Sequence, residues 1–338
     1  MKGYAKYLFK KLGWYILTIF IAVLLNFTLP RLMPGNPVSS IVTAATEGLT
    51  DAAAIRAVYE AFMAEFGLDR PIWQQFFIYI RNLVQGNLGF SFIQYPRPVV
   101  DIIRGAVPWT LRLQLPAIFT GWLLGNTLGA LAAYRKGVFD RVFFPFFLFI
   151  AAIPAFGLAI VHVHFFANQF RLFPQSLGYA FDMLPNWSNP RFLFSVFRHY
   201  QLPFITMVIA MIGGQSLGMR EMSLYELNAD YVKYSRLMGI KDNKIVFYVF
   251  RNAMLPQITG LALALGTMIG GNLVAEIVFS YPGIGTTLFR SITNMDFPVI
   301  SACTLIITVM VLAANFIVDI ICGIIDPRVR IAQQEEAG

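Results

Sequence analysis

Six stretches of this chain are long and apolar enough to cross a membrane as helices, and they limit its fold more than any other feature. A membrane-spanning helix needs about 20 mostly apolar residues, because the bilayer core offers the backbone no water to bond with. The stretches cover residues 14–30, 107–134, 142–167, 201–219, 254–279 and 298–323. Hydrophobic residues make up 57% of the chain and charged residues 13%. The sequence therefore predicts an all-α integral membrane protein with six transmembrane helices.

The positions of the lysines predict which loops face the cytoplasm. Basic residues favour the cytoplasmic side of short loops, and every lysine falls in residues 1–13, 135–141 or 220–253. They are Lys2, Lys6, Lys10, Lys11, Lys136, Lys233, Lys241 and Lys244. With six spans, we therefore predict that both termini are cytoplasmic. We interpret the first helix as an uncleaved anchor, because its apolar run is longer than the roughly 7–15 residues of a signal peptide and no A-x-A-like cleavage site follows it. Because the basic residues lie between apolar runs, the net charge of +8 indicates membrane topology and lipid contact rather than nucleic-acid binding.

Two hydrophilic segments are too long to be simple connections. Residues 31–106, which follow the N-terminal segment and first helix at 1–30, are predicted to form an extracytoplasmic subdomain. It should contain one helix from 51 to 66 and another from 71 to 83, opened by Pro71, whose fixed φ suits a first helical turn. The transmembrane core would then occupy 107–323, and a cytoplasmic tail 324–338.

The second long segment, 220–253, is predicted to form two amphipathic cytoplasmic helices. In the first, the spacing of Tyr231, Tyr234, Ser235 and Met238 places them on one helical face. Gly239 interrupts this helix. Asp242 can cap a second helix over 243–253.

A few polar residues inside the predicted spans are candidate functional residues. Glu276 and Asp319 are costly in lipid and should face protein or water, either as functional groups or as helix-to-helix hydrogen bonds. His162 and His164 are two positions apart, whereas a chelating helical pair is spaced i and i+4. They therefore favour a satisfied polar role over a metal site.

Glycine rows in the second and fifth spans predict close helix contacts. They consist of Gly121, Gly125 and Gly129, and of Gly266, Gly270 and Gly271. Such rows let another backbone approach closely. The opposing helix can belong to this subunit or to a partner, and spacing alone leaves both open.

The sequence contains no recognisable catalytic or nucleotide-binding motif. We find no Cys–His cluster, no GxSxG turn and no GxxxxGK[ST] phosphate loop. We therefore expect no enzymatic activity and no metal or cofactor in this chain. If the protein uses ATP, the nucleotide site belongs to another chain.

The inner loop and its flanks resemble a known family. ADYVKYSRLMGIKDNKIVFYVFRNAMLP, from Ala229 to Pro256, is similar to the EAA-loop region of membrane permeases of ATP-binding-cassette importers, most of all the dipeptide/oligopeptide group. Agreement continues over nearly the whole chain. The matching segments are RLMPGNP from Arg31, GLDRPIWQQFFIYIRNLVQGNLGFSF from Gly67, VFSYPGIGTTLF from Val278, NMDFPV from Asn294 and DPRVR from Asp326.

The resemblance implies an ATPase-docking element in the inner loop. It should comprise Lys233, Tyr234, Ser235, Arg236, Leu237, Met238, Gly239 and Ile240. Gly239 stands at the family's glycine and Leu255-Pro256 at its closing Leu-Pro. Lys233-Tyr234-Ser235 replaces the Glu-Ala-Ala triplet that names the loop, which departs from the general importer pattern.

The resemblance also implies a machine with several partners in a prokaryotic cytoplasmic membrane. These are a second homologous permease, two ATPase subunits that bind ATP and Mg, and an extracytoplasmic solute-binding protein received by segment 31–106. Short peptides are the expected cargo, with oligosaccharides and nickel complexes as alternatives. The loop at 168–200 matches the family poorly and is interpreted as an outer feature. A rival hypothesis is an ion-coupled transporter that uses Glu276, Asp319 and the histidines.

Overall fold

The chain folds into helices joined mostly by short turns. The computed structural model describes residues 2–32, 42, 46, 51–65, 67–135, 137–271 and 273–325. Its helices are α1 (Lys2–Leu32), α3 (Ala52–Glu65), α4 (Ile72–Val84), α5 (Val99–Arg135), α6 (Gly137–Ala152), α7 (Ala155–His162), the π-helix η1 (Val163–Gln169), α8 (Pro190–Leu227), α9 (Asp230–Leu237), α10 (Asp242–Gly271), α11 (Leu273–Val278), α12 (Ile284–Thr293) and α13 (Phe297–Ile325). Within these ranges strand pairing is limited to one isolated bridge between Phe90 and Pro98. The predicted all-α class is confirmed.

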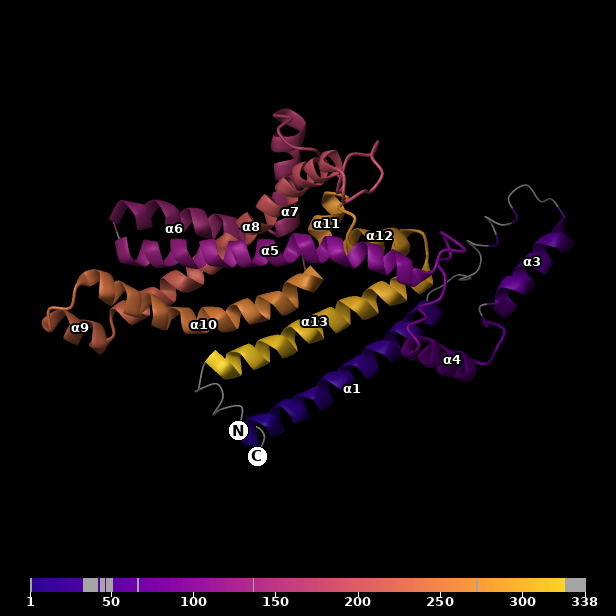
Figure 1. The fold of residues 1–338 in the computed structure, drawn as a ribbon, viewed down its shortest axis with the longest axis horizontal. Coiled ribbons are helices and arrows are strands. Elements are labelled where there is room, and N and C mark those ends of the chain that lie inside the picture. The colour runs from indigo at the N-terminus through magenta and orange to yellow at the C-terminus, as the bar shows by residue number, and fades with distance from the viewer. Residues whose placement is uncertain are drawn as a thin grey trace. The chain divides into compact units, whose positions relative to one another are not determined.

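The helices group into two compact units (Figure 1). The first is built mainly from Thr110–Pro282 and the second from Lys10–Trp109 with Gly283–Val309. The long helices α1, α5 and α13 each contribute residues to both units. The first unit contains the predicted cytoplasmic loop, and the second contains the predicted outer subdomain.

Four described helices are long and apolar enough to span a membrane, and a bent pair adds a fifth candidate. The four spans are Lys10–Thr28, Val99–Arg135, Pro190–Leu227 and Phe297–Ile317. The bent pair, Asp140–Ala152 with Ala155–Gln169, turns through 100°. The prediction of one continuous helix over 142–167 is therefore wrong. Pro154 lies at the bend, with φ −58° and ψ 144°. Proline disfavours helical backbone in the residue before it, here Ile153, and has no N–H to donate to the preceding turn, so α6 ends before it.

The predicted fifth span, 254–279, falls on the end of α10 and on α11. Residue 272, between these helices, lies outside the described residues. The inner helix predicted over 243–253 also differs from the structure, because α10 starts at Asp242 and continues past Pro256 to Gly271. A count of six spans therefore stays a prediction.

The first glycine row packs inside this subunit. A Cβ atom on Gly121 would lie 2.8 Å from the Met211 Cβ, and one on Gly125 would lie 2.6 Å from the Gln215 Cβ. The Ser216 hydroxyl donates to the Gly125 carbonyl oxygen over 3.1 Å. This row therefore brings α5 against α8, as close backbone approach allows. The second row, Gly266, Gly270 and Gly271, lies outside the described side chains.

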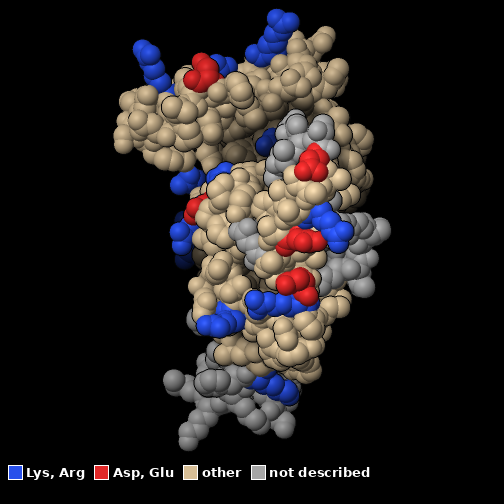
Figure 2. Space-filling model, turned by 90° about the vertical axis from the view of Figure 1, so that its right-hand side faces the viewer, with Lys and Arg blue, Asp and Glu red and all other residues tan. Residues whose placement is uncertain are grey.

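The two helices predicted between residues 51 and 83 match the structure closely. The prediction of 51–66 corresponds to α3 (Ala52–Glu65), and that of 71–83 to α4 (Ile72–Val84). The Asp51 carboxylate accepts a hydrogen bond from the Ala53 N–H over 3.0 Å at the start of α3. On the face shown in Figure 2, acidic and basic side chains are interspersed among uncharged atoms, and neither sign forms a continuous patch.

Candidate docking and coupling site

The inner loop forms a helical hairpin in which α9 turns back into α10 (Figure 1). Gly239 makes this turn with φ +71°, in the left-handed region that glycine adopts without strain. Its N–H donates to the Arg236 carbonyl over 3.0 Å, and the Ile240 N–H donates to the Ser235 carbonyl over 3.1 Å. These two bonds form a Schellman motif, which satisfies the free carbonyls at the end of α9. The predicted helix break at Gly239 is confirmed.

One face of α9 is anchored to its neighbours. Val232, Ile245 and Val249 form a buried cluster, and Tyr231 and Ile240 pack against it. The Tyr231 hydroxyl donates to the Glu226 carboxylate over 2.8 Å. Burial, together with this hydrogen bond, raises the pKa of Tyr231 to about 12. The phenol therefore remains a protonated donor at neutral pH.

The opposite face of α9 is exposed and apolar. Tyr234 is 65% exposed, Leu237 82% and Met238 71%. The residues predicted to share a face differ in exposure, because Ser235 is buried and Tyr231 half-buried, whereas Tyr234 and Met238 are exposed. We call Tyr234, Leu237 and Met238 the exposed trio. Adjacent exposed apolar side chains of this size are typical of an interaction site.

Of the other predicted docking residues, Lys233, Arg236 and Gly239 are also exposed, whereas Ile240 is half-buried. The Lys233 ammonium lies 3.0 Å from the Asp230 carboxylate, and both side chains are well exposed to solvent. Such a surface ion pair stabilises a helix by only about 0.5 kcal/mol. The basic side chains therefore remain available to a partner at the edge of the exposed trio.

A partly buried ion pair ties α8, which leads into the hairpin, to the start of α6. The Arg220 guanidinium donates twice to the Asp140 carboxylate, over 2.6 and 2.7 Å. The same guanidinium lies 4.1 Å from the centre of the Phe144 ring. A two-pronged pair of this kind fixes orientation as well as distance. Sequence reasoning missed it, because the partners are 80 positions apart and no local pattern joins them.

Glu276 is fully buried on α11. Its side-chain oxygen accepts a hydrogen bond from the Gln114 amide of α5 over 3.2 Å. This contact corresponds to the helix-to-helix hydrogen bond that was one of the two predicted alternatives. The side chain of Asp319, in α13, lies outside the described residues, so its role stays a prediction.

The two histidines lie on different sides of their helical segment, as their spacing predicts. His162 is buried, with its Nδ1 2.8 Å from the Thr206 hydroxyl of α8, whereas His164 is exposed on η1. His162 thus has the satisfied polar role expected of it. Within the described part of the chain, no group of three His, Cys, Asp or Glu residues is placed to hold a metal ion.

In the second unit, two of the sequence segments that resemble the family meet at Asp296. The buried Asp296 carboxylate accepts hydrogen bonds from the Ser91 hydroxyl and, over 3.0 Å, from the Phe92 N–H. Ser91 belongs to the GFSF segment and Asp296 to NMDFPV, more than 200 positions later. A single acid directly before the apolar Phe297-Pro298 was the only sequence signal for this contact.

The loop before α8 is packed rather than detached. The Leu177 N–H donates to the Phe279 carbonyl over 2.9 Å, and the Arg112 guanidinium lies 4.3 Å from the centre of the Trp187 ring. The predicted outer feature at 168–200 ends inside α8, which begins at Pro190. The described loop is therefore shorter than predicted.

Comparison with known proteins shows the family to which this chain belongs. The family described as "Binding-protein-dependent transport system inner membrane component" matches residues 125–331. The chain is 30% identical over 328 residues to the dipeptide transport system permease protein of Lactococcus lactis subsp. cremoris, covering 96% of this chain and 99% of the relative. It is 32% identical over 339 residues to the di/tripeptide transport system permease protein of Pseudomonas aeruginosa, covering 95% and 97%.

A third relative is the glutathione transport system permease protein of Escherichia coli K12. It is 31% identical to this chain over 326 residues, and the alignment covers 96% of this chain and 98% of the relative. The matched region contains α8, the α9–α10 hairpin and the candidate docking residues. The family match and the alignments with the relatives both include the elements that form the site. The chain therefore belongs to the family of inner membrane components of binding-protein-dependent transport systems.

Proposed function

We propose that this chain is the permease subunit of an ATP-binding-cassette importer and forms half of the path for short peptides. An extracytoplasmic solute-binding protein would deliver the cargo, and a second homologous permease would form the other half. Relatives named for dipeptides, di/tripeptides and glutathione support peptides over oligosaccharides or nickel complexes. Both termini would lie in the cytoplasm.

The exposed trio on α9 is the observation that carries the proposal. Three apolar side chains stand outward while the opposite face of the same helix is held by Val232 and its cluster. A partner that gripped the trio would therefore move a rigid hairpin rather than a loose loop. We assign this grip to a soluble ATPase, which would bind ATP and Mg in its own chain.

Motion of the hairpin would reach the spans by two routes. One is α10, which continues from the turn into the apolar part of the chain. The other is α8, whose Arg220 is joined to Asp140 at the start of α6. ATP binding would draw the two docking hairpins of the complex together and open the path outward, and hydrolysis would reset it, as in other two-state bundles.

An ion-coupled transporter is the alternative mechanism. It would use Glu276 as the titrating group. A carboxyl group can accept the Gln114 hydrogen bond in either protonation state, so this contact is compatible with both mechanisms. The two mechanisms differ in what drives uptake. In proteoliposomes containing the whole complex, peptide uptake should require ATP and should not follow an imposed ion gradient.

The docking assignment is tested with two exposed leucines. Leu237→Asp places a charge in the exposed trio, whereas Leu184→Asp changes a leucine that is 88% exposed in the loop before α8. With the complex co-expressed, we expect Leu237→Asp to lower ATPase co-purification by about tenfold or more, as loss of a central interface residue does. Leu184→Asp should co-purify normally, and both variants should insert into the membrane.

Two results would contradict the assignment. One is normal ATPase binding and ATP-driven uptake by Leu237→Asp. The other is an equal loss of ATPase from both variants, because this would indicate a general effect of added charge rather than a site on α9.

A further inference from the structure

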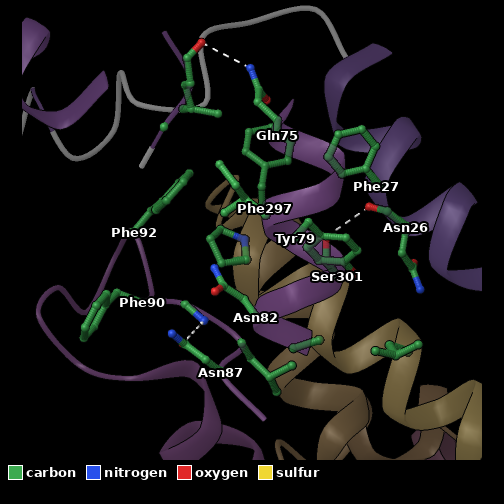
Figure 3. Close-up of a pocket in the computed structure, with 18 residues that line it drawn as sticks. Asn26, Phe27, Gln75, Tyr79, Asn82, Asn87, Phe90, Phe92, Phe297 and Ser301 are labelled. Carbon is green, nitrogen blue, oxygen red and sulfur yellow. Dashed lines mark hydrogen bonds between the residues drawn. The ribbon is translucent and has the colours of Figure 1, made fainter. Parts of the chain in front are cut away.

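The second unit contains a cavity of about 210 Å³ between α1, α4, α13 and the turn after α4 (Figure 3). Its apolar wall includes Phe27, Ile78, Phe297 and Leu305. For comparison, an engineered cavity of about 150 Å³ holds a benzene molecule. This cavity is therefore large enough for an alkyl segment of more than six carbon atoms.

The wall of the cavity includes the ends of two candidate membrane spans. Asn26 and Phe27 lie at the end of the span Lys10–Thr28, and Phe297 begins the span Phe297–Ile317. The cavity therefore lies at the depth where hydrocarbon gives way to polar headgroups. The face of α1 turned away from Phe27 is exposed and apolar, with Ile21 47% exposed, Leu24 43% and Leu25 50%, as expected for a helix in contact with lipid.

The polar side chains at the cavity are the amides of Asn26, Gln75, Asn82 and Asn87 and the hydroxyls of Tyr79 and Ser301. The described residues that line it include no Lys, Arg, Asp or Glu, so the cavity selects for an uncharged ligand. The Gln75 amide is already bonded to the Arg70 carbonyl over 2.8 Å. The side-chain amide of Asn82, by contrast, makes no hydrogen bond within the described part of the chain, although it is half-buried.

Asn87 places a second amide beside Asn82. The Asn87 N–H donates to the Asn82 carbonyl over 2.8 Å, and Figure 3 shows the two side chains near each other at one end of the cavity. The Asn87 side-chain oxygen accepts a hydrogen bond from the Gly89 N–H over 3.0 Å, so the NH₂ group of this exposed lining residue can donate to another acceptor. Two amide donors next to an apolar wall match an ester carbonyl attached to an alkyl chain.

The wall is held in place from both sides. Asp296, directly before Phe297, accepts a hydrogen bond from the Phe92 N–H over 3.0 Å. The Asn26 side-chain oxygen accepts one from the Thr304 hydroxyl over 2.6 Å. These hydrogen bonds join α1 and the turn at Phe92 to α13 and to the residue before it. The walls of the cavity are therefore fixed by contacts within the second unit.

We propose that this cavity binds one acyl chain of a membrane phospholipid, with the ester carbonyl at Asn82 and Asn87. The alkyl chain would lie against Phe27 and Leu305. A bound lipid would then fix the second unit at the membrane surface. The assignment does not depend on which solute the chain transports.

The test is photo-crosslinking in a lipid bilayer. The full-length chain is placed in nanodiscs containing a phosphatidylethanolamine with a diazirine on one acyl chain, irradiated, digested and mapped by mass spectrometry. We expect label on peptides that contain Phe27 and Leu305. Ala302→Leu, which adds three carbons at the cavity wall, should lower that labelling about tenfold, equivalent to roughly two buried methylene groups.

Ala313→Leu on the exposed side of α13 is the matched control and should label as the unmodified chain does. If Ala302→Leu fails to fold, Ser301→Leu on the same wall replaces it. Label confined to exposed α1 residues, or unchanged cavity labelling in the filled variant, would overturn the proposal. Loss of the cavity label on adding the solute-binding protein would also overturn it, since this would assign the cavity to a protein partner.

Discussion

At the scale of single residues, the inner hairpin depends on the backbone of Gly239. Its φ of +71° is open to glycine and, with less ease, to asparagine, whereas a β-branched residue is strained there. No side chain or backbone atom outside its immediate neighbours lies within 4 Å of a Cβ built at this position. The requirement at Gly239 is therefore one of backbone conformation and not of space.

Substitutions at Gly239 should rank by their tolerance of positive φ. Gly239→Val should destabilise the turn by about 1–2 kcal/mol, the cost of left-handed backbone in an L-residue, and Gly239→Asn should cost less. Protease cleavage between α9 and α10, together with ATPase co-purification, measures the effect. Equal behaviour of the valine and asparagine variants would show that the turn does not depend on φ.

At the scale of elements, α5 and α8 meet through glycines that leave no room for a methyl group. Gly125 is one such position, because a Cβ there would lie 2.6 Å from the Gln215 Cβ and 3.1 Å from the Ile212 carbonyl oxygen. Gly105 lies on the same helix, where an added Cβ meets nothing within 4 Å. The two glycines therefore form a matched pair for substitution.

Gly125→Ala should lower the free energy of unfolding by about 1–3 kcal/mol through overpacking. Gly105→Ala should leave stability unchanged or raise it by roughly 0.5–1 kcal/mol, because alanine favours helix over glycine. Thermal unfolding of the two purified variants in one detergent makes the comparison. A stable Gly125→Ala protein would show that α5 and α8 are not packed this closely.

Elements with local signals were predictable from the sequence. The cap at Asp51, Pro71 before α4 and Gly239 after α9 each act within a few residues, and α3, α4 and the hairpin turn were predicted to within a residue or two. The bend at Pro154 was missed because mean hydropathy across 142–167 outweighed one proline. The Arg220–Asp140 and Ser91–Asp296 contacts join distant segments, and a single sequence holds no periodicity that reports them.

At the scale of the whole molecule, sidedness is the prediction that joins the elements into a transporter. The hairpin should face the cytoplasm and the loop before α8 the outside. Leu237 and Leu184 are suitable labelling sites because they are 82% and 88% exposed. Cysteines at these two positions would therefore differ in the side they face rather than in burial.

In a chain whose native cysteines are replaced by alanine, Leu184→Cys should react with a membrane-impermeant maleimide applied to intact spheroplasts. Leu237→Cys should react only after the membrane is permeabilised. Labelling of Leu237→Cys in intact spheroplasts would place the hairpin outside, and a cytoplasmic ATPase could not then reach it.

The exposed trio also has a consequence for how the chain is produced. Copies made in excess of their partners would leave an adhesive surface uncovered, and uncovered apolar surface promotes aggregation and proteolysis. Matched synthesis of the subunits would then protect this chain as much as it assembles the transporter. An orphan copy would be short-lived because of the same side chains that make the assembled copy useful.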